Sequence, residues 1–233
     1  MKKLILSVLL IPAVFSAQQT VSRDPEIANY VSQVSADSLK SHINKLVSFG
    51  TRHTMSSTTD AKKGIGAARN WVLSKFKNYA KNSDGRMEVF LQSQTIQPDG
   101  KRINQPTDLG NAIAILRGTD PNDKRIFMIG GHLDSRVSDV MNNKDFAPGA
   151  NDDGSGVGAV IESARVLSQS RFPATIVFVA FSGEEQGLLG AKMLAEKAKT
   201  ENWQLEALLN NDMVGNNLSS ETNLINANQL RVF

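Results

Sequence analysis

Two stretches of the sequence decide the fold: residues 126–135 read IFMIGGHLDS, and residues 175–190 read TIVFVAFSGEEQGLLG. Each begins with a short apolar run of residues that favour strands and continues into ionisable side chains. A third apolar run, Leu205–Leu209, is followed by Asp212. Short apolar runs separated by helix-like segments are typical of parallel strands in an open α/β sheet. The sequence therefore predicts an α/β fold with a mostly parallel central sheet flanked by helices.

The ionisable side chains fall at positions where these strands end. In an open α/β sheet, ligands bind outside the carboxyl ends of the strands. A histidine together with several carboxylates at that edge predicts a metal site, and zinc accepts both kinds of ligand. A single acid of this kind would be a solvated strand end or a helix cap, so the prediction depends on the convergence of four clusters. The residues concerned are His132, Asp134, Asp152, Asp153, Glu184, Glu185 and Asp212.

Asp152 and Asp212 suit a site with two metal ions. Asp152 lies in a glycine-rich stretch, APGANDDGSG at residues 147–156, and its two carboxylate oxygens can bridge two cations. Two metals about 3.5–4 Å apart can share a water and hold both oxygens of a hydrolytic transition state. Asp212 can complete the coordination of the second metal. Asp153 also precedes a helix, where acidic side chains are favoured without any metal.

The neighbouring Glu184 and Glu185 can divide the roles of ligand and base between them. A general base must reach the attacking water and must not be held by the metal, so one glutamate can act as the base while the other binds metal. Asp134 follows His132 by two residues. Because a metal-bound imidazole usually donates its second N–H to a carboxylate or carbonyl, Asp134 is a candidate for that acceptor.

The composition argues against several other classes of function. The chain of 233 residues carries 26 basic and 23 acidic side chains, a formal charge of +3. This balance gives no indication of a nucleic-acid or membrane-surface partner. The chain contains no cysteine, so neither a disulfide framework nor a thiolate metal site is available.

Residues 1–17 have the pattern of a secretory signal peptide, in which two lysines precede the apolar run Leu4–Phe15 and small residues follow. A transmembrane helix is the alternative, but it needs about 20 apolar residues and this run is shorter. We therefore expect a secreted or periplasmic protein. The remainder divides into a helical N-terminal region over residues 18–82 and a catalytic domain over residues 83–233.

The helical region contains two histidines that need not bind metal. Ser35 can cap a helix whose apolar residues recur at helical spacing. His42 lies beside that apolar stripe, so we expect it to pack there and not to act as a ligand. His53 follows Arg52 in a loop rich in glycine, serine and threonine. It could line a substrate cleft, but a structural role is the stronger expectation. A second helix is predicted over Ile65–Tyr79.

Four segments resemble the signatures of a known family. GGHLDS, APGANDDGSG, SGEEQGLLG and NNDMVG are similar, in order and spacing, to those of the secreted di-zinc aminopeptidases, metallopeptidase family 28, and the match runs from about Asn111 to Gly215. The resemblance implies a helix-flanked sheet, two zinc ions, and a cis peptide bond between Asp152 and Asp153. It places His132 and Asp212 on one zinc, Glu185 on the other and Asp152 between both, with Glu184 as general base and Asp134 behind His132.

One ligand of that family has no counterpart in this sequence. Its members take a second zinc-binding histidine from nearer the C-terminus, whereas the histidines here are His42, His53 and His132. We therefore expect the sequence to be the N-terminal part of a longer protein, with a sheet that is incomplete on its C-terminal side and exposes apolar area. A degenerate homologue that binds less metal is the alternative.

The resulting hypothesis is a secreted zinc aminopeptidase that releases N-terminal residues from peptides by a metal-activated water, with Glu184 as the base. A glutaminyl cyclase is one alternative, because these single-zinc enzymes resemble the same family. The second acid at the Asp152–Asp153 step argues against it. A non-catalytic, peptidase-like binding domain is the other alternative. The intact acidic set argues against it, and the absent histidine argues for it.

Overall fold

The computed structural model describes residues 23–218, 223 and 225. The signal peptide predicted over residues 1–17 lies outside this range, so it stays a prediction. No helix within the described residues has the length and apolar character that crossing a membrane requires. The elements of the described part are, in chain order, α1 (Pro25–Ser32), α2 (Ala36–Val47), α3 (Gly64–Ala80), β1 (Met87–Ile96), β2 (Thr107–Leu116), β3 (Arg125–His132), α4 (Gly154–Leu167), β4 (Thr175–Phe181), α5 (Leu189–Thr200) and β5 (Gln204–Asn210).

The strands form one sheet in the order β1-β2-β4-β3-β5. β3 pairs in parallel with β4 on one side and β5 on the other, whereas β2 is antiparallel to both β1 and β4. Among the described strands, only β2 therefore runs against the others, which confirms the mostly parallel sheet. The antiparallel β1–β2 edge was not predicted. It arises because the connection over residues 97–106 is shorter than the dozen or more residues that a parallel crossover needs.

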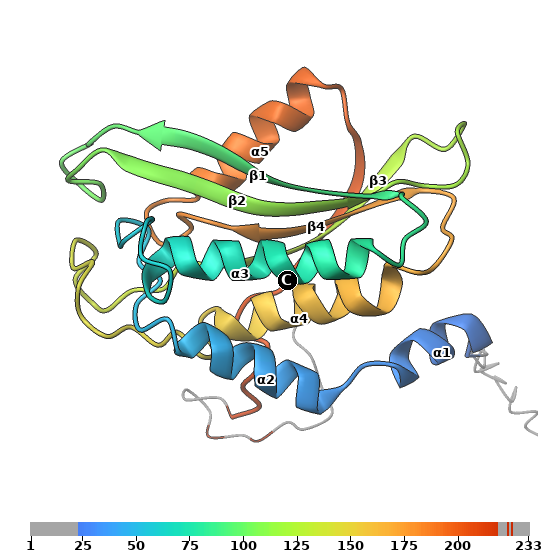
Figure 1. Ribbon diagram of the computed structural model, residues 1–233, viewed down its shortest axis with the longest axis horizontal. Coiled ribbons are helices and arrows are strands. Elements are labelled where there is room, and N and C mark those ends of the chain that lie inside the picture. The colour runs from blue at the N-terminus through green and yellow to red at the C-terminus, as the bar shows by residue number, and fades with distance from the viewer. Residues whose placement is uncertain (1–22, 219–222, 224, 226–233) are drawn as a thin grey trace, which may run out of the picture.

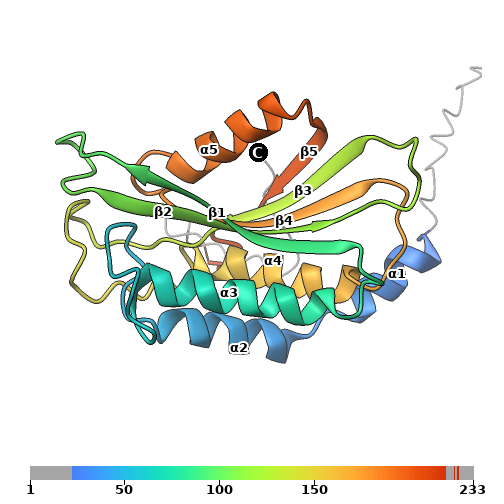
Figure 2. The same cartoon turned by 45° about the horizontal axis from the view of Figure 1, so that its top comes forward.

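Helices cover both faces of this sheet. α2, α3 and α4 lie on one face (Figure 1), and α5 lies on the other (Figure 2). The larger hydrophobic cluster fills the space beneath the three helices, and a smaller one lies under α5. Phe178 of β4 belongs to the larger cluster, while its neighbours Val177 and Val179 belong to the smaller one, and all three are fully buried. This alternation is the pattern of a strand that is buried on both faces.

The helical N-terminal region packs onto the same core. As predicted, α2 begins after Ser35, whose hydroxyl accepts a hydrogen bond from the Ser38 amide at 3.2 Å. The Ser35 amide in turn donates to Glu162 of α4 at 2.7 Å, which fixes α2 against α4. His42 is buried 3.9 Å from this glutamate, and burial lowers the pKa of His42. The expectation of a packing histidine is confirmed.

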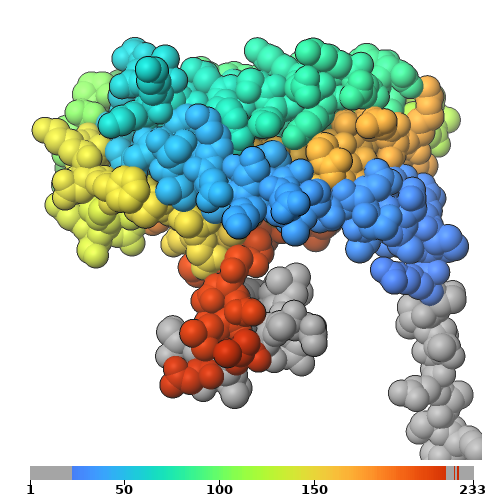
Figure 3. All heavy atoms as spheres, turned by 60° about the horizontal axis from the view of Figure 1, so that its bottom comes forward, coloured from blue at the N-terminus to red at the C-terminus, as the bar shows by residue number. Residues whose placement is uncertain are grey.

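β5 is an exposed edge of the sheet. Leu205, Leu208 and Leu209 are 45%, 44% and 64% exposed, and the segment that follows β5 projects from the body of the protein (Figure 3). A strand of a helix-covered sheet normally has both faces covered. For the described residues, the expectation that one side of the sheet stays open and exposes apolar area is confirmed.

Replacing Phe178 with alanine tests the placement of the core. Because this side chain is fully buried, we expect the free energy of unfolding to fall by about 3–5 kcal/mol, measured by urea denaturation. Phe146→Ala is the control, since Phe146 is 65% exposed and its loss should change the free energy of unfolding by no more than about 0.5 kcal/mol. Equal effects of the two substitutions would contradict this placement.

Candidate metal centre

The carboxyl ends of three neighbouring parallel strands bring the candidate ligands to one edge of the sheet. His132 is the last residue of β3, Glu184 lies just beyond the end of β4, and Asp212 lies just beyond the end of β5. Asp152 comes from the loop that leads into α4. The convergence that the sequence predicted for these residues is therefore present in the structure.

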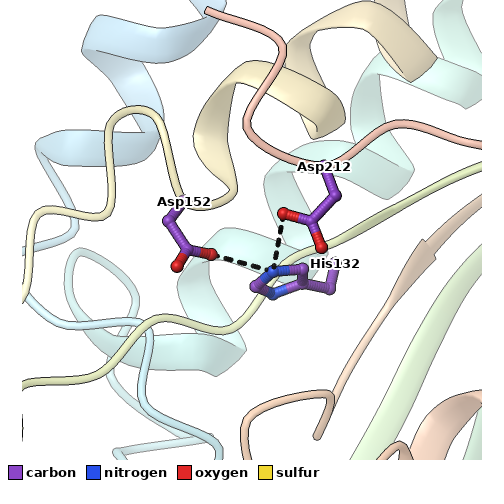
Figure 4. A group of neighbouring side chains, drawn as sticks. All are labelled: His132, Asp152 and Asp212. Atoms are coloured by element: carbon purple, nitrogen blue, oxygen red, sulfur yellow. Dashed lines mark ion pairs between the residues drawn. The ribbon is translucent and has the colours of Figure 1, made fainter. Parts of the chain in front are cut away.

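Three of these side chains point toward one another (Figure 4). Nε2 of His132 lies 3.0 Å from Oδ1 of Asp152 and 3.9 Å from Oδ1 of Asp212, and the three candidate ligand atoms all lie within 4.8 Å of one another. Ligand atoms at zinc-binding distance from a tetrahedral ion are about 3.4 Å apart. One nitrogen and two carboxylate oxygens at this spacing fit a zinc ion. His132 is buried, whereas about half of each aspartate side chain is exposed, so the site is open on one side.

Asp134 is fully buried next to His132, and its carboxylate holds several groups in addition to facing the imidazole. Nδ1 of His132 lies 3.1 Å from the backbone oxygen of Asp134 and 3.8 Å from its carboxylate, so the carbonyl is the nearer acceptor for the imidazole N–H. The carboxylate accepts the amide N–H groups of Glu184 and Glu185, both at 3.1 Å, and the Thr54 hydroxyl at 2.9 Å. Asp134 therefore fixes the segment after β4 against the end of β3.

Asp153 is also buried, and its carboxylate binds backbone groups. It accepts the amide N–H groups of His132 at 2.9 Å, Gly156 at 2.8 Å and Met213 at 3.3 Å. It is the N-cap of α4, which confirms the helix-cap interpretation of this acid. Because Met213 directly follows Asp212, the Asp153 carboxylate links the segment that carries His132 to the segment that carries Asp212. Its peptide bond to the preceding residue is cis, as the resemblance implies.

Glu184 and Glu185 have different surroundings. Glu184 lines an open cavity of about 280 Å³ together with His132 and Asp212. The Glu185 carboxylate instead accepts a hydrogen bond from Nε of Arg136 at 2.6 Å, and it does not belong to the group of three ligands. The rest of the cavity wall is mainly apolar and comes from Phe181, Leu188, Ala191, Leu208 and Asn210.

The acidic surroundings set the protonation of the site. Burial by itself lowers the pKa of His132, but the nearby carboxylates, Asp134 foremost, outweigh burial and raise the pKa to about 10. Burial raises the pKa of Asp153 to about 7 and also raises the pKa of Glu184. Carboxylates that crowd one another in this way favour a cation among them, and a bound zinc ion supplies such a charge.

Sequence reasoning missed a buried network that supports the acidic residues. The Thr54 hydroxyl contacts both Asp134 and the amide oxygen of Gln186, and the amide nitrogen of Gln186 lies 3.1 Å from Nε2 of His53. His53 is fully buried, and its Nε2 lies 3.0 Å from the Val140 oxygen. The expected structural role of His53 is thus confirmed. In the sequence, Thr54 belongs to a run of polar loop residues. Such a run does not reveal that its partner, Gln186, lies 132 residues further along the chain.

An open α/β sheet that gathers a histidine and two aspartates beyond its parallel strands defines an α/β metalloprotein with a site suited to zinc. The family model described as Peptidase family M28 matches residues 111–230. The chain belongs to this family, which confirms the resemblance seen in the sequence.

A relative with a described function gives the same indication. A protein of Pyrenophora teres f. teres (strain 0-1), described as a probable zinc metalloprotease, is 45% identical to this chain over 211 residues. The match covers 90% of this chain and 45% of the relative. The chain thus spans about half the length of the curated relatives it matches.

Solved structures share the fold. The LapA aminopeptidase of Legionella pneumophila has a TM-score of 0.61 at 21% identity, with 91% of this chain and 52% of that chain covered. The glutaminyl cyclase of Bacteroides thetaiotaomicron bound to N-acetylhistamine has a TM-score of 0.62 at 21% identity, with 80% and 65% covered. At such identities the likeness confirms the helix-flanked α/β sheet and does not distinguish between the two activities.

Gly156 lets α4 approach the segment that carries Asp212. A Cβ at this position would lie 2.2 Å from the backbone oxygen of Asn211 and 2.5 Å from both carboxylate oxygens of Asp153. We expect Gly156→Ala to displace this segment and to weaken zinc binding about 10–100-fold, measured by competition with a chromogenic chelator.

Gly158→Ala is the matched control on the same helix. A Cβ there would have no atom nearer than 3.5 Å, and alanine is favoured over glycine inside a helix by about 0.5–1 kcal/mol. This variant should bind zinc like the wild type. An equal loss of zinc affinity in both variants would show that the close approach at Gly156 does not matter for the site.

Proposed function

We propose that the protein is an exported zinc aminopeptidase that removes N-terminal residues from peptides. The observation that carries the proposal is the group formed by His132, Asp152 and Asp212, with Glu184 at the same open cavity. A zinc site and a carboxylate that is not bound to the metal are the two parts that hydrolysis of a peptide bond needs. Membership of Peptidase family M28 and the relatives described as zinc metalloproteases support peptide hydrolysis.

The residues of this chain divide the chemistry among them. His132, Asp152 and Asp212 would hold a zinc ion, which when bound polarises the scissile carbonyl and acidifies water. Glu184 would take a proton from the attacking water and give it to the leaving amine. Burial raises the pKa of Glu184, which makes it a stronger base. The hydrogen bond from its amide to Asp134 fixes the backbone that presents it.

We also propose that the complete site holds two zinc ions, with Asp152 between them. Glu185 is the ligand that this chain offers to the second ion, and it pairs with Arg136 in the structure. A carboxylate has two oxygens, so Glu185 can bind a cation through one while Arg136 holds the other. Metal analysis of the whole protein tests the stoichiometry, and a single zinc ion per chain at saturation would rule out the second site.

A single-zinc glutaminyl cyclase is the second candidate function. The observation in its favour is that, among the described residues, one group of three side chains brings its ligand atoms together. One such group is enough for one zinc ion. The acid that follows Asp152 no longer argues against a cyclase, because the Asp153 carboxylate accepts hydrogen bonds from backbone amides and does not belong to that group. The shared fold of the Bacteroides enzyme is compatible with either activity.

Substrate turnover by the whole protein separates the candidates. Release of nitroaniline from aminoacyl-nitroanilides, without cyclisation of N-terminal glutamine, is the expected result. The opposite pattern would establish the cyclase, and zinc binding without either reaction would establish a binding domain. Export is a separate proposal that rests on residues 1–17. N-terminal sequencing of the mature protein tests it, and a retained leader in the cytoplasm would refute it.

Glu184→Gln tests the assignment of the base. Loss of a general base typically lowers the rate by about 10²–10⁴-fold, so we expect kcat to fall by this factor while the zinc content stays unchanged. The matched substitution Glu185→Gln should instead lower the zinc content of the second site. Activity that survives in the Glu184 variant together with lost metal would reverse the two assignments.

A further inference from the structure

Arg52 is 1% exposed and is the largest of the fully buried side chains among the described residues. Its hydrogen-bond partners are unusual for a buried arginine. Its guanidinium donates to four backbone carbonyls: Leu133 at 2.7 Å, Leu46 at 3.2 Å, Pro148 at 2.7 Å and Gly149 at 2.9 Å. Within the described residues, no carboxylate forms an ion pair with it at 4 Å or less. A buried cation held only by carbonyls is costly unless other charges compensate for it.

The carbonyls that Arg52 binds lie next to the candidate ligands. Leu133 stands between His132 and Asp134 in the chain, so one N–H of Arg52 holds the end of β3. Pro148 and Gly149 begin the loop that carries Asp152. The oxygen of Gly149 also accepts the amide N–H of Gly154 at 2.9 Å, which closes this loop. A single planar guanidinium therefore joins the two segments that supply the histidine and the first aspartate.

The backbone around Arg52 strengthens the same connection. The amide of Arg52 donates to the hydroxyl of Ser135 at 3.1 Å, and that hydroxyl donates to the oxygen of Ala147 at 2.8 Å. The amide of Ala147 in turn donates to the oxygen of Gly50 at 3.0 Å. The chain around Arg52 is thus inserted between the segment after β3 and the loop before α4, and hydrogen-bonded to both.

The charge of Arg52 is balanced at a distance by the acids of the site. Burial lowers the pKa of Arg52 to about 10, and Asp134, Asp153 and Asp152 oppose this fall. Asp134 and Asp153 are themselves buried and accept backbone N–H groups. A buried cation among buried anions is stabilised without a direct ion pair, which leaves all guanidinium donors free to bind carbonyls.

From these contacts we propose that Arg52 is a positioning residue of the metal centre, which sets the distance between His132 and Asp152 by holding Leu133 and Gly149 in one hydrogen-bonded fork. The proposal rests on the zinc site of the proposed function, and it adds a residue that touches neither metal nor substrate. Lysine cannot replace it, because an ammonium group keeps the charge but does not have the fixed planar fork that reaches separate carbonyls.

Arg52→Lys in the whole protein is the test, with the zinc dissociation constant measured by competition with a chromogenic chelator. We expect zinc affinity to fall about 10–100-fold, the usual effect of losing a residue that orients metal ligands. At saturating zinc, we expect kcat to fall more than KM rises, because misplaced ligands affect the transition state more than binding. If Arg52 acted only through its positive charge, the zinc affinity of this variant would be unchanged, since lysine keeps that charge.

Arg69→Lys is the matched control. Arg69 is also buried, at 5% exposure, and it binds the backbone and side chain of Asp108, away from the group of ligands. This variant should lose thermal stability and keep wild-type zinc affinity. If Arg52→Lys and Arg69→Lys both lower the melting temperature and both bind zinc like the wild type, Arg52 is merely structural and the proposal is overturned.

A milder variant covers the case in which Arg52→Lys does not fold. Ser135→Ala removes the hydroxyl that accepts from the Arg52 amide and binds Ala147. A severalfold loss of zinc affinity in this variant supports the proposal, and unchanged affinity overturns it. A wild-type protein that binds zinc but turns over no peptide would refute the proposed function, while the comparison of zinc affinities would still decide the role of Arg52.

Discussion

The parallel pairing of β3 with β4 and β5 is the constraint on which the site depends. His132 lies opposite Phe181 of β4, and Gly130 lies opposite Asn210 of β5. The segments that carry Glu184 and Asp212 therefore leave the sheet beside the histidine. In a strand, a shift of one residue in register moves every side chain to the opposite face. β4 is buried from Val177 to Phe181 and opposes such a shift, because its side chains fill hydrophobic clusters on both faces.

The acids of the site divide into two kinds by burial. Asp134 and Asp153 are fully buried, and each carboxylate accepts three hydrogen bonds from backbone amides or a hydroxyl. Such bonds are what a buried carboxylate needs in place of water. Asp152 and Asp212 are about half exposed, so they have oxygens available for a cation. The buried pair thus forms the rigid support, and the exposed pair forms the candidate site with His132.

Much of this arrangement could be predicted from local patterns. The apolar runs at residues 126–129, 175–181 and 205–209 all lie within strands, and Ser35 caps a helix. The helix α5 was not predicted, because its N-cap residue, Leu188, has a left-handed conformation and a side chain that cannot cap the helix. The bonds from Asp134 to the segment after β4 and most bonds of the Arg52 guanidinium could not be predicted either, since the partners concerned lie 50 to 97 residues away in the chain.

The sequence by itself determined the class of fold, the family and the residue types of the site, because strand periodicity and the spacing of acidic clusters are local properties of the chain. The tertiary structure decided the distances within the site and the contacts around it. It set how closely Asp152 and Asp212 approach His132, brought the amide of Met213 to Asp153, and paired Glu185 with Arg136. These outcomes depend on strand order, register and burial. Such properties arise only when distant segments pack together, so no local pattern of residues can encode them.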